Sequence, residues 1–404
     1  MYPELFTIPF VDMPVKSYGA MLTLGFLTGV WLCMRRAEHV KADPDIILNV
    51  GFVSLLCGVG GGRLFFVLHY WETSFANQPN PIMAALNMTS GGLEYYGGLI
   101  CAAIGTVTYL AMKRVSVRMY LDILFPGAAW GLAFGRIGCL LNGCCWGGMC
   151  VAPNGAATVP WGITFPYGSP AEIRQWENRQ TTVPAELIVS IPGRVSQPYL
   201  LPRPLIEMPP EERDGLAAEI RQLEREIEEA KALGVAAEKI AELEKEQKGL
   251  AEKWKRESQM YGALNYAQKF PSRIDPSRPI TVSELEDLTH HHRSELVHPA
   301  QIYAVINAFL LSWLLLEIAN HRKRHGVVFG TMILIYPITR IILEYVRVDN
   351  PHDSAGLTIS QAVSVGMFLF GVAYMIYIYK SPLRSPKAVP FVPPPLEDDD
   401  AESA

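Results

Sequence analysis

Long apolar runs dominate both ends of the chain, and charged residues gather in its central part. Seven of these runs reach roughly the 20 residues that a helix needs to cross a bilayer. Several contain glycine and one contains Pro337, residues that are more frequent in membrane helices than in soluble ones. The pattern predicts an all-α membrane protein, a bundle of seven transmembrane helices. The seven runs cover residues 18–34, 46–68, 93–112, 123–141, 301–319, 328–346 and 358–379.

Basic residues alternate between the two sides of these runs. Twelve Lys and Arg follow the first, third, fifth and seventh runs, whereas the opposite short segments hold only Lys16 and Arg347. Because short cytoplasmic loops are enriched in Lys and Arg, we expect the N-terminus outside and the C-terminus in the cytoplasm. Arg35-Arg36 after the first run, with no small-residue cleavage site, indicates a transmembrane helix rather than a cleaved signal peptide.

Composition supports a membrane protein. Of the 404 residues, 50% are hydrophobic and only 19% are charged, against about 25% charged in average soluble domains. The mean hydropathy is +0.15. A net charge of −5 argues against a generally basic surface that binds nucleic acid.

The order of the runs predicts four segments. Residues 1–147 hold transmembrane helices one to four, residues 148–297 an extracytoplasmic cap, residues 298–380 helices five to seven, and residues 381–404 a disordered cytoplasmic tail. Within the cap, residues 209–257 alternate Glu, Lys and Arg with apolar residues at helical spacing, interrupted by Gly234. We expect a helical hairpin or a kinked helix there, acting as a solvated spacer or a partner-docking element.

Several ionisable residues lie inside the apolar runs, where each one costs several kcal/mol and usually marks a functional site. Arg63 follows three glycines, and Arg136 lies in the sequence Gly135-Arg-Ile-Gly138. Arg340, Glu344 and Arg347 share one helix face because of their i, i+4, i+7 spacing. The structural alternative is that these residues pair with one another or extend to the membrane interface.

An excess of Arg over local carboxylates points instead to an anionic ligand. Arg is the side chain best suited to bidentate binding of phosphate. Glycine clusters beside Arg63, Tyr96 and Arg136 allow a ligand or a second backbone to approach closely, although ordinary helix packing explains each of them equally well. An anion held between membrane helices is most simply a phospholipid headgroup.

Four of the seven cysteines gather within twelve residues, at Cys139, Cys144, Cys145 and Cys150. Their spacing differs from the paired C-x2–4-C pattern of zinc sites. A disulfide or plain packing is the favoured interpretation, with a metal ion or direct chemistry left open. His290, His291 and His292 are interpreted as a polar loop, and His298-Pro299 as the start of the fifth helix.

Six motifs occur in an order that resembles bacterial prolipoprotein diacylglyceryl transferases, and the resemblance covers about residues 1–150 and 297–380. The motifs are Tyr18-Gly, Gly61-Gly-Arg63, Gly91-Gly-Leu-Glu-Tyr-Tyr96-Gly-Gly-Leu-Ile, Gly135-Arg-Ile-Gly-Cys-Leu-Leu-Asn-Gly143 with Trp146-Gly147, His298-Pro-Ala-Gln-Ile-Tyr303, and Arg340-Ile-Ile-Leu-Glu344-Tyr-Val-Arg347-Val-Asp349.

The resemblance implies an enzyme of the bacterial inner membrane. It implies transfer of the diacylglyceryl group of phosphatidylglycerol to the lipobox cysteine in a prolipoprotein signal peptide, with release of glycerol phosphate. This is the first step of lipoprotein maturation. Arg136 and Arg340 match the two essential arginines that face the phosphate. We expect a further set of residues to bind the headgroup of phosphatidylglycerol: Tyr18, Arg63, Cys139, Asn142, Gly147, His298, Glu344 and Arg347.

The chain departs from the family pattern at four positions: Tyr96 replaces a usual His, Cys139 an Asn, Cys144 a carboxylate and Ala304 a Glu. Attack by a thiolate requires that the leaving phosphate be stabilised, which two guanidiniums in a low-dielectric site achieve. A tyrosine is a weak base near neutral pH. We therefore expect Tyr96 to position the headgroup or relay the proton, while the positive field lowers the pKa of the acceptor thiol; no metal or other cofactor is required.

Three other interpretations remain. The main one is a lipid-binding or scaffold member of the same fold that has lost activity. A small-anion transporter is disfavoured because the sequence lacks paired repeats and broken helices in corresponding halves. A redox or metal protein built on the cysteine cluster is the third.

Overall fold

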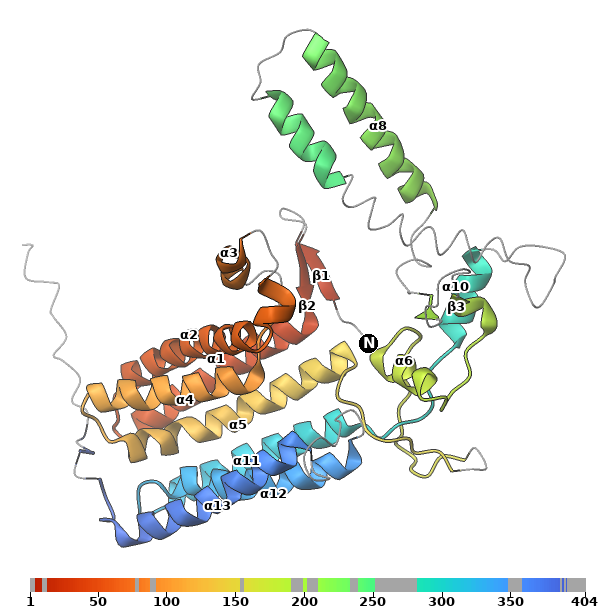
Figure 1. Cartoon of the computed structure of the whole chain (residues 1–404). Helices are drawn as coiled ribbons and strands as arrows, with labels where there is room; N and C mark the ends of the chain where they lie inside the picture. Colours follow the sequence, from red (N-terminus) through yellow and green to blue (C-terminus); the bar gives the residue numbers. More distant parts are fainter. Residues whose placement is uncertain are drawn as a thin grey trace, which may run out of the picture. The chain divides into compact units, whose positions relative to one another are not determined.

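The computed structural model of the chain (Figure 1) describes residues 4–8, 13–76, 80–87, 92–152, 156–189, 199–201, 210–232, 239–250, 282–347, 358–385, 387–388 and 390. Two compact units make up the chain. Residues 148–299 form one, and residues 2–147 together with 300–404 form the other.

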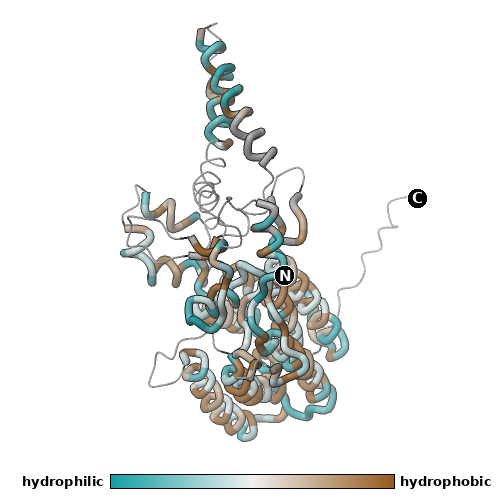
Figure 2. The backbone as a smooth tube through the Cα atoms, turned by 90° about the vertical axis from the view of Figure 1, so that its right-hand side faces the viewer, coloured by the Kyte–Doolittle hydropathy of each residue, from teal (hydrophilic) through white to brown (hydrophobic). Residues whose placement is uncertain are grey.

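The second of these units is a helical bundle. Its described part contains seven helices that are long and apolar enough to cross a membrane, coloured mainly in hydrophobic brown in Figure 2. This confirms the predicted all-α membrane fold. The helices are α1 (Ser17–His39), α2 (Pro44–His69), α4 (Tyr95–Met112), α5 (Val117–Asn142), α11 (Ala300–His321), α12 (Val327–Val346) and α13 (Ile359–Lys380).

Several helices extend beyond the apolar runs, because capping residues set their ends. The Asp43 side chain accepts a hydrogen bond from the backbone N–H of Asp45 at 2.9 Å at the start of α2. Ser116 does the same for Met119 at the start of α5, which begins at Val117 rather than at the predicted Ile123. Thr358 and Gln361 form a reciprocal capping box before α13. Caps satisfy the free N–H groups of the first helical turn, whether or not that turn is apolar.

Close backbone packing joins α1 to α5. A Cβ atom placed on Gly29 would lie 2.9 Å from the carbonyl oxygen of Gly127, and a Cβ on Gly127 would lie 2.6 Å from that of Gly29. Only glycine permits this approach. The other main packing pairs are α2 with α4, α5 with α11, and α12 with α13. Large apolar side chains such as Leu56 and Trp313 are exposed on the outer surface, as expected of a surface that faces lipid.

Four short elements complete the described part of the bundle unit. Strands β1 (Glu4–Ile8) and β2 (Met13–Lys16) pair antiparallel ahead of α1. The π-helix η1 (Trp71–Phe75) and the short helix α3 (Pro81–Leu86) follow α2.

The unit of residues 148–299 has its own core of Tyr167, Leu187, Leu200, Leu201 and Leu285. This core is built from α6 (Pro170–Glu177), η2 (Ala185–Leu187), the paired strands β3 (Ile188–Val189) and β4 (Tyr199–Leu200), and α10 (Val282–His291). The fully buried carboxylate of Glu172 accepts a hydrogen bond from the N–H of Gly168 at 2.7 Å and lies 3.0 Å from Nε2 of His292. The unit is therefore held by apolar packing around one buried polar pair.

An antiparallel pair of helices projects from the same unit. Helix α8 (Pro210–Ala232) contacts a second helical segment, residues 239–250, through Lys231 and Glu244 (2.7 Å) and through Gln247 and Glu224 (3.2 Å). Gly234 lies outside the described residues, as does the acidic tail from residue 391 onward.

Candidate active site

One cavity in the bundle unit lies between α5, α11, α12 and the turn after α5. Three guanidinium groups line it, those of Arg136, Arg340 and Arg347. The remaining lining residues are Leu132, Cys145, Ala300, Gln301, Ala304, Asn307, Ala308, Leu311, Tyr336 and Leu343. Three of the arginines singled out in the sequence therefore meet at one place.

The turn after α5 brings its side chains back to the cavity. Gly143 ends α5 in the left-handed conformation (φ 74°), and Cys145 also has positive φ (63°). For a residue with a Cβ atom this conformation costs on the order of 1 kcal/mol. The amide of Gln301 donates to the carbonyl of Cys144 at 2.8 Å, and the backbone of Gly147 pairs with that of Arg347. These contacts fix the turn between the start of α11 and the end of α12.

Arg340 is held by a carboxylate on its own helix. Its Nη1 lies 2.6 Å from Oε2 of Glu344, one turn further along α12. The other carboxylate oxygen accepts a hydrogen bond from Oγ1 of Thr358 at 3.0 Å, and Glu344 is only 5% exposed. This ion pair is the structural alternative raised for Arg340, and it also ties α12 to the cap of α13.

Arg136 differs from Arg340. Within the part of the chain that the structure describes, no hydrogen bond or ion pair reaches its guanidinium. A half-buried guanidinium without a carboxylate partner is unfavourable unless an anion occupies the site. Arg136 is therefore the residue of this cavity best placed to receive an external anion.

Tyr18 and Tyr95 lie near the arginines at helix starts, and Tyr336 of α12 lines the cavity with them. Tyr95 interacts electrostatically with Arg136 and Arg340, and its ring packs edge-on against that of Tyr96, with centroids 5.5 Å apart. Tyr18, near the start of α1, interacts with Arg136 in the same way. Tyr18 and Tyr95 thus lie near Arg136, and the role of Tyr96 stays a prediction.

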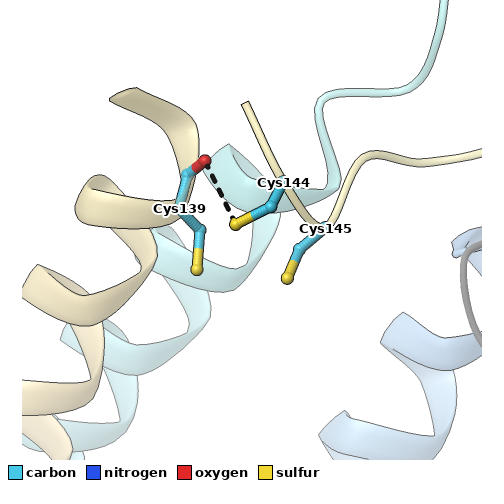
Figure 3. Close-up of side chains that lie close together, drawn as sticks. All are labelled: Cys139, Cys144 and Cys145. Carbon is cyan, nitrogen blue, oxygen red and sulfur yellow. Dashed lines mark hydrogen bonds between the residues drawn. The ribbon is translucent and has the colours of Figure 1, made fainter. Parts of the chain in front are cut away.

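Three cysteine thiols gather beside Arg136. Figure 3 shows Cys139 on the last turns of α5 and Cys144 and Cys145 on the turn that follows. The three sulfur atoms lie within 4.8 Å of one another, and all seven cysteines are free thiols. Hydrogen bonds from the thiols of Cys139 and Cys144, together with Arg347 and Arg136, hold the pKa of the Cys145 thiol well below its ordinary value. Asn142 interacts with the thiol of Cys144.

Two of the predicted site residues have other contacts. The guanidinium of Arg63 is buried and donates to the carbonyls of Ala84, Ala85, Asn87 and Gly92 at 2.7–3.0 Å. These bonds support the loop around α3. They give Arg63 a structural role, and its predicted contact with substrate stays a prediction. His298 belongs to the unit of residues 148–299, where its N–H donates to the carbonyl of Gly148 at 2.9 Å.

Sequence reasoning missed the part of the cavity that α11 supplies. Ala300, Ala304 and Ala308 follow one another at four-residue spacing, so they share a face, and their small side chains leave room beside Arg136. Gln301 and Asn307 add polar groups to the same wall of the cavity. That combination of small and polar residues was present in the sequence and could have marked α11 as a cavity wall.

The fold and the site together define a class, a seven-helix membrane protein with an arginine-lined cavity between its helices. The family model of prolipoprotein diacylglyceryl transferase matches residues 3–377, and the chain belongs to that family. This confirms the resemblance drawn from the motifs.

Curated relatives agree with this membership. A phosphatidylglycerol–prolipoprotein diacylglyceryl transferase of Rhodopirellula baltica is 34% identical over 166 residues, 41% of this chain and 32% of the relative. Those of Clostridium tetani and Proteus mirabilis are 33% and 31% identical, over 36% and 49% of this chain and 56% and 66% of the relatives. The chain thus spans between about a third and two thirds of the length of these relatives.

Proposed function

We propose that this protein transfers the diacylglyceryl group of phosphatidylglycerol to the thiol of a lipobox cysteine in a prolipoprotein signal peptide, the first step of lipoprotein maturation. The observation that carries the proposal is the meeting of Arg136, Arg340 and Arg347 in one cavity between membrane helices. Membership of the transferase family supports it, as do the relatives that bear the name of this activity.

The chemistry assigns roles to Arg136 and Arg340. As the acceptor sulfur bonds to the glycerol carbon, the bond from that carbon to the phosphate oxygen breaks, and negative charge grows on the leaving phosphate. Donors fixed in a low-dielectric site stabilise such charge strongly. Arg340, already oriented by Glu344, is a preorganised donor, and Arg136 has a guanidinium ready for bidentate contact with two phosphate oxygens.

The tyrosines complete the proposed site. Tyr96 positions the headgroup or relays the proton of the acceptor thiol, and its ring packs against that of Tyr95, which interacts with Arg136 and Arg340. The positive field of the arginines favours the thiolate form of the acceptor.

The proposed location is the bacterial cytoplasmic membrane, with the N-terminus outside and the C-terminus in the cytoplasm. The distribution of basic residues in the short loops supports this orientation. Arg136, Gly147 and Arg347 lie toward the ends of α5 and α12 opposite to those basic loops. This supports a position of the substrate phosphate toward the outer leaflet, where the signal peptide of an exported protein emerges.

Two assays test the proposal. The purified chain is expected to attach labelled diacylglycerol from phosphatidylglycerol to a lipobox peptide, and to restore lipoprotein modification in bacteria depleted of their own enzyme. Arg136→Ala is expected to abolish both while the protein still inserts into the membrane. Arg35→Ala, which alters an exposed arginine outside the cavity, is the matched control. Failure of the unaltered chain in both assays would favour a lipid-binding scaffold instead.

The tyrosine roles are separated by removing one hydroxyl at a time. Tyr96→Phe keeps the ring that packs on Tyr95 and removes only the hydroxyl. Full transfer by Tyr96→Phe together with loss in Tyr95→Phe would move the proton or headgroup role from Tyr96 to Tyr95.

A further inference from the structure

The three thiols of Cys139, Cys144 and Cys145 form a cluster that the proposed transfer chemistry does not use. Their sulfur atoms lie within 4.8 Å of one another, and Figure 3 shows all three gathered at the end of α5. Cys139 is buried, and the other two are half-buried. The sulfur of Cys144 also lies 3.8 Å from the carbonyl oxygen of Cys139. The turn at Gly143, with the positive φ of Cys145, is what folds two sulfurs back toward the third.

The spacing of the sulfurs suits a small thiophilic cation. With Zn–S bonds of about 2.3 Å, two thiolates of a tetrahedral ion lie about 3.8 Å apart. Shifts of about 1 Å or less therefore close the cluster around an ion. Ca²⁺ and Mg²⁺ are excluded on chemical grounds, because they select oxygen ligands. Three protein ligands also leave the fourth tetrahedral position open, as in zinc sites that bind a reactant.

The charges around the cluster favour such a complex. Three thiolates and one divalent ion carry a net charge of −1. Arg136 and Arg347 lie close enough to Cys145 to interact with charge on its sulfur, and Arg136 also interacts with Cys139. Two guanidiniums stabilise an anionic complex that they would oppose if the ligands were neutral.

The cluster also reaches the proposed site of reaction. Cys145 lines the cavity together with Arg136, Arg340 and Arg347. The described lining residues include no histidine and no carboxylate, so the cavity wall supplies no ordinary base for the acceptor thiol. Coordination by a metal ion deprotonates a thiol without a base.

We propose that Cys139, Cys144 and Cys145 bind a thiophilic divalent cation of the Zn²⁺ class, and that the acceptor thiol of the prolipoprotein occupies its fourth position. The acceptor part of this inference rests on the proposed function; the metal site itself does not. The acceptor thiol releases its proton to water on binding and attacks as the thiolate. The sulfur–carbon bond forms, the carbon–oxygen bond breaks, and its electron pair leaves on the phosphate oxygen held by the arginines, with no change of oxidation state.

Metal binding is measured first, on the full chain purified in nanodiscs without chelators. Elemental analysis is expected to find one zinc per chain, and Co²⁺ in its place is expected to give sulfur-to-cobalt charge-transfer absorption. Cys139→Ser, Cys144→Ser and Cys145→Ser are each expected to lose both signals. Cys57→Ser, which changes a cysteine of α2 outside the cluster, keeps them. Absence of bound metal, or a disulfide within the cluster found by thiol titration, would overturn the proposal.

Transfer is measured second, before and after removal of the metal. A thiol with a pKa near 8.5 is about 3% ionised at pH 7. Stripping the ion is therefore expected to slow transfer by up to about 30-fold at pH 7 and much less at pH 9, with recovery on adding Zn²⁺. A purely structural ion would not produce that change in pH profile. Bound metal with transfer unaffected by stripping would overturn the acceptor role. A chain that binds zinc but never transfers lipid would instead contradict the proposed function.

Discussion

Nη1 of Arg340 lies 2.6 Å from the carboxylate of Glu344, while Glu344 in turn accepts a hydrogen bond from Thr358. This relationship fixes the guanidinium of Arg340 in place before any substrate arrives. Arg136, across the same cavity, has no such partner among the residues that the structure describes. The two arginines thus differ: Arg340 is oriented by a protein carboxylate, whereas Arg136 is open to an external anion.

Glu344→Gln tests this preorganisation. The amide still accepts a hydrogen bond from Thr358 but no longer neutralises Arg340, so a buried charge loses its partner. Breaking such a pair costs about 3 kcal/mol, and we expect both a lower Tm in detergent and slower transfer. Glu317→Gln removes a half-exposed carboxylate of α11 that pairs with His321 and serves as the control. A Glu344→Gln protein with unaltered Tm and transfer rate would show that Arg340 does not depend on this carboxylate.

Arg136→Lys tests the geometry of the proposed phosphate contact. Lysine keeps the positive charge but lacks the planar fork of donors. Loss of one donor to a developing oxyanion typically reduces turnover by about 100-fold, and we expect a loss of that order in the transfer assay. Because no protein group in the described residues is bonded to Arg136, the Tm is expected to stay unchanged. Near-normal transfer by the lysine variant would mean that charge alone suffices.

Asp122→Asn tests a structural carboxylate of the bundle. The fully buried carboxylate of Asp122 accepts hydrogen bonds from the N–H groups of Gly326 (2.7 Å) and Phe329 (2.9 Å) and lies 3.2 Å from Nε of Arg322. Its loss leaves the buried Arg322 unpaired, and we expect a destabilisation of about 3–5 kcal/mol. Thermal unfolding measures this loss of stability. Adding Arg322→Leu to Asp122→Asn is expected to recover part of the lost stability. No recovery in the double variant would mean that the destabilisation comes from the lost hydrogen bonds at the start of α12.

His325 gives a prediction for pH. Burial lowers the pKa of His325 to about 4, and the nearby Arg322, Arg118 and Arg384 contribute to the shift. The unfolded chain, in which histidine titrates near 6.5, then binds a proton that the folded protein excludes. Stability is therefore fully present above pH 6.5 and falls as the pH is lowered from about 6.5 to 4.

The comparison of Tm at several pH values checks this dependence. His325→Asn keeps an acceptor near the position of Nδ1, which receives the N–H of Ser385, and removes the titrating group. We expect a smaller fall in Tm for this variant than for the parent chain between pH 6.5 and 4. Equal falls in the two proteins would place the pH dependence elsewhere.

The sequence by itself determined the membrane helices and the local side-chain relationships. A helix of about 20 residues must be apolar to lie in a bilayer, so hydropathy located all seven. Residues four apart on a helix necessarily share a face, so the spacing of Arg340 and Glu344 allowed their ion pair but did not decide between that pair and an external anion. The helix ends were less certain, because capping residues such as Ser116 act through hydrogen bonds that hydropathy does not register.

Tertiary structure alone decided which of the charged residues face the cavity. Arg63 was conspicuous in the sequence for the same reason as Arg136, yet it bonds to backbone carbonyls of another segment. Gln301 appeared in the sequence only as part of a motif and Ala304 only as a departure from the family pattern, yet both line the cavity wall. The rotation of each helix about its axis depends on packing against helices far away in the chain, and that rotation determines whether a guanidinium meets a protein carbonyl or an open space.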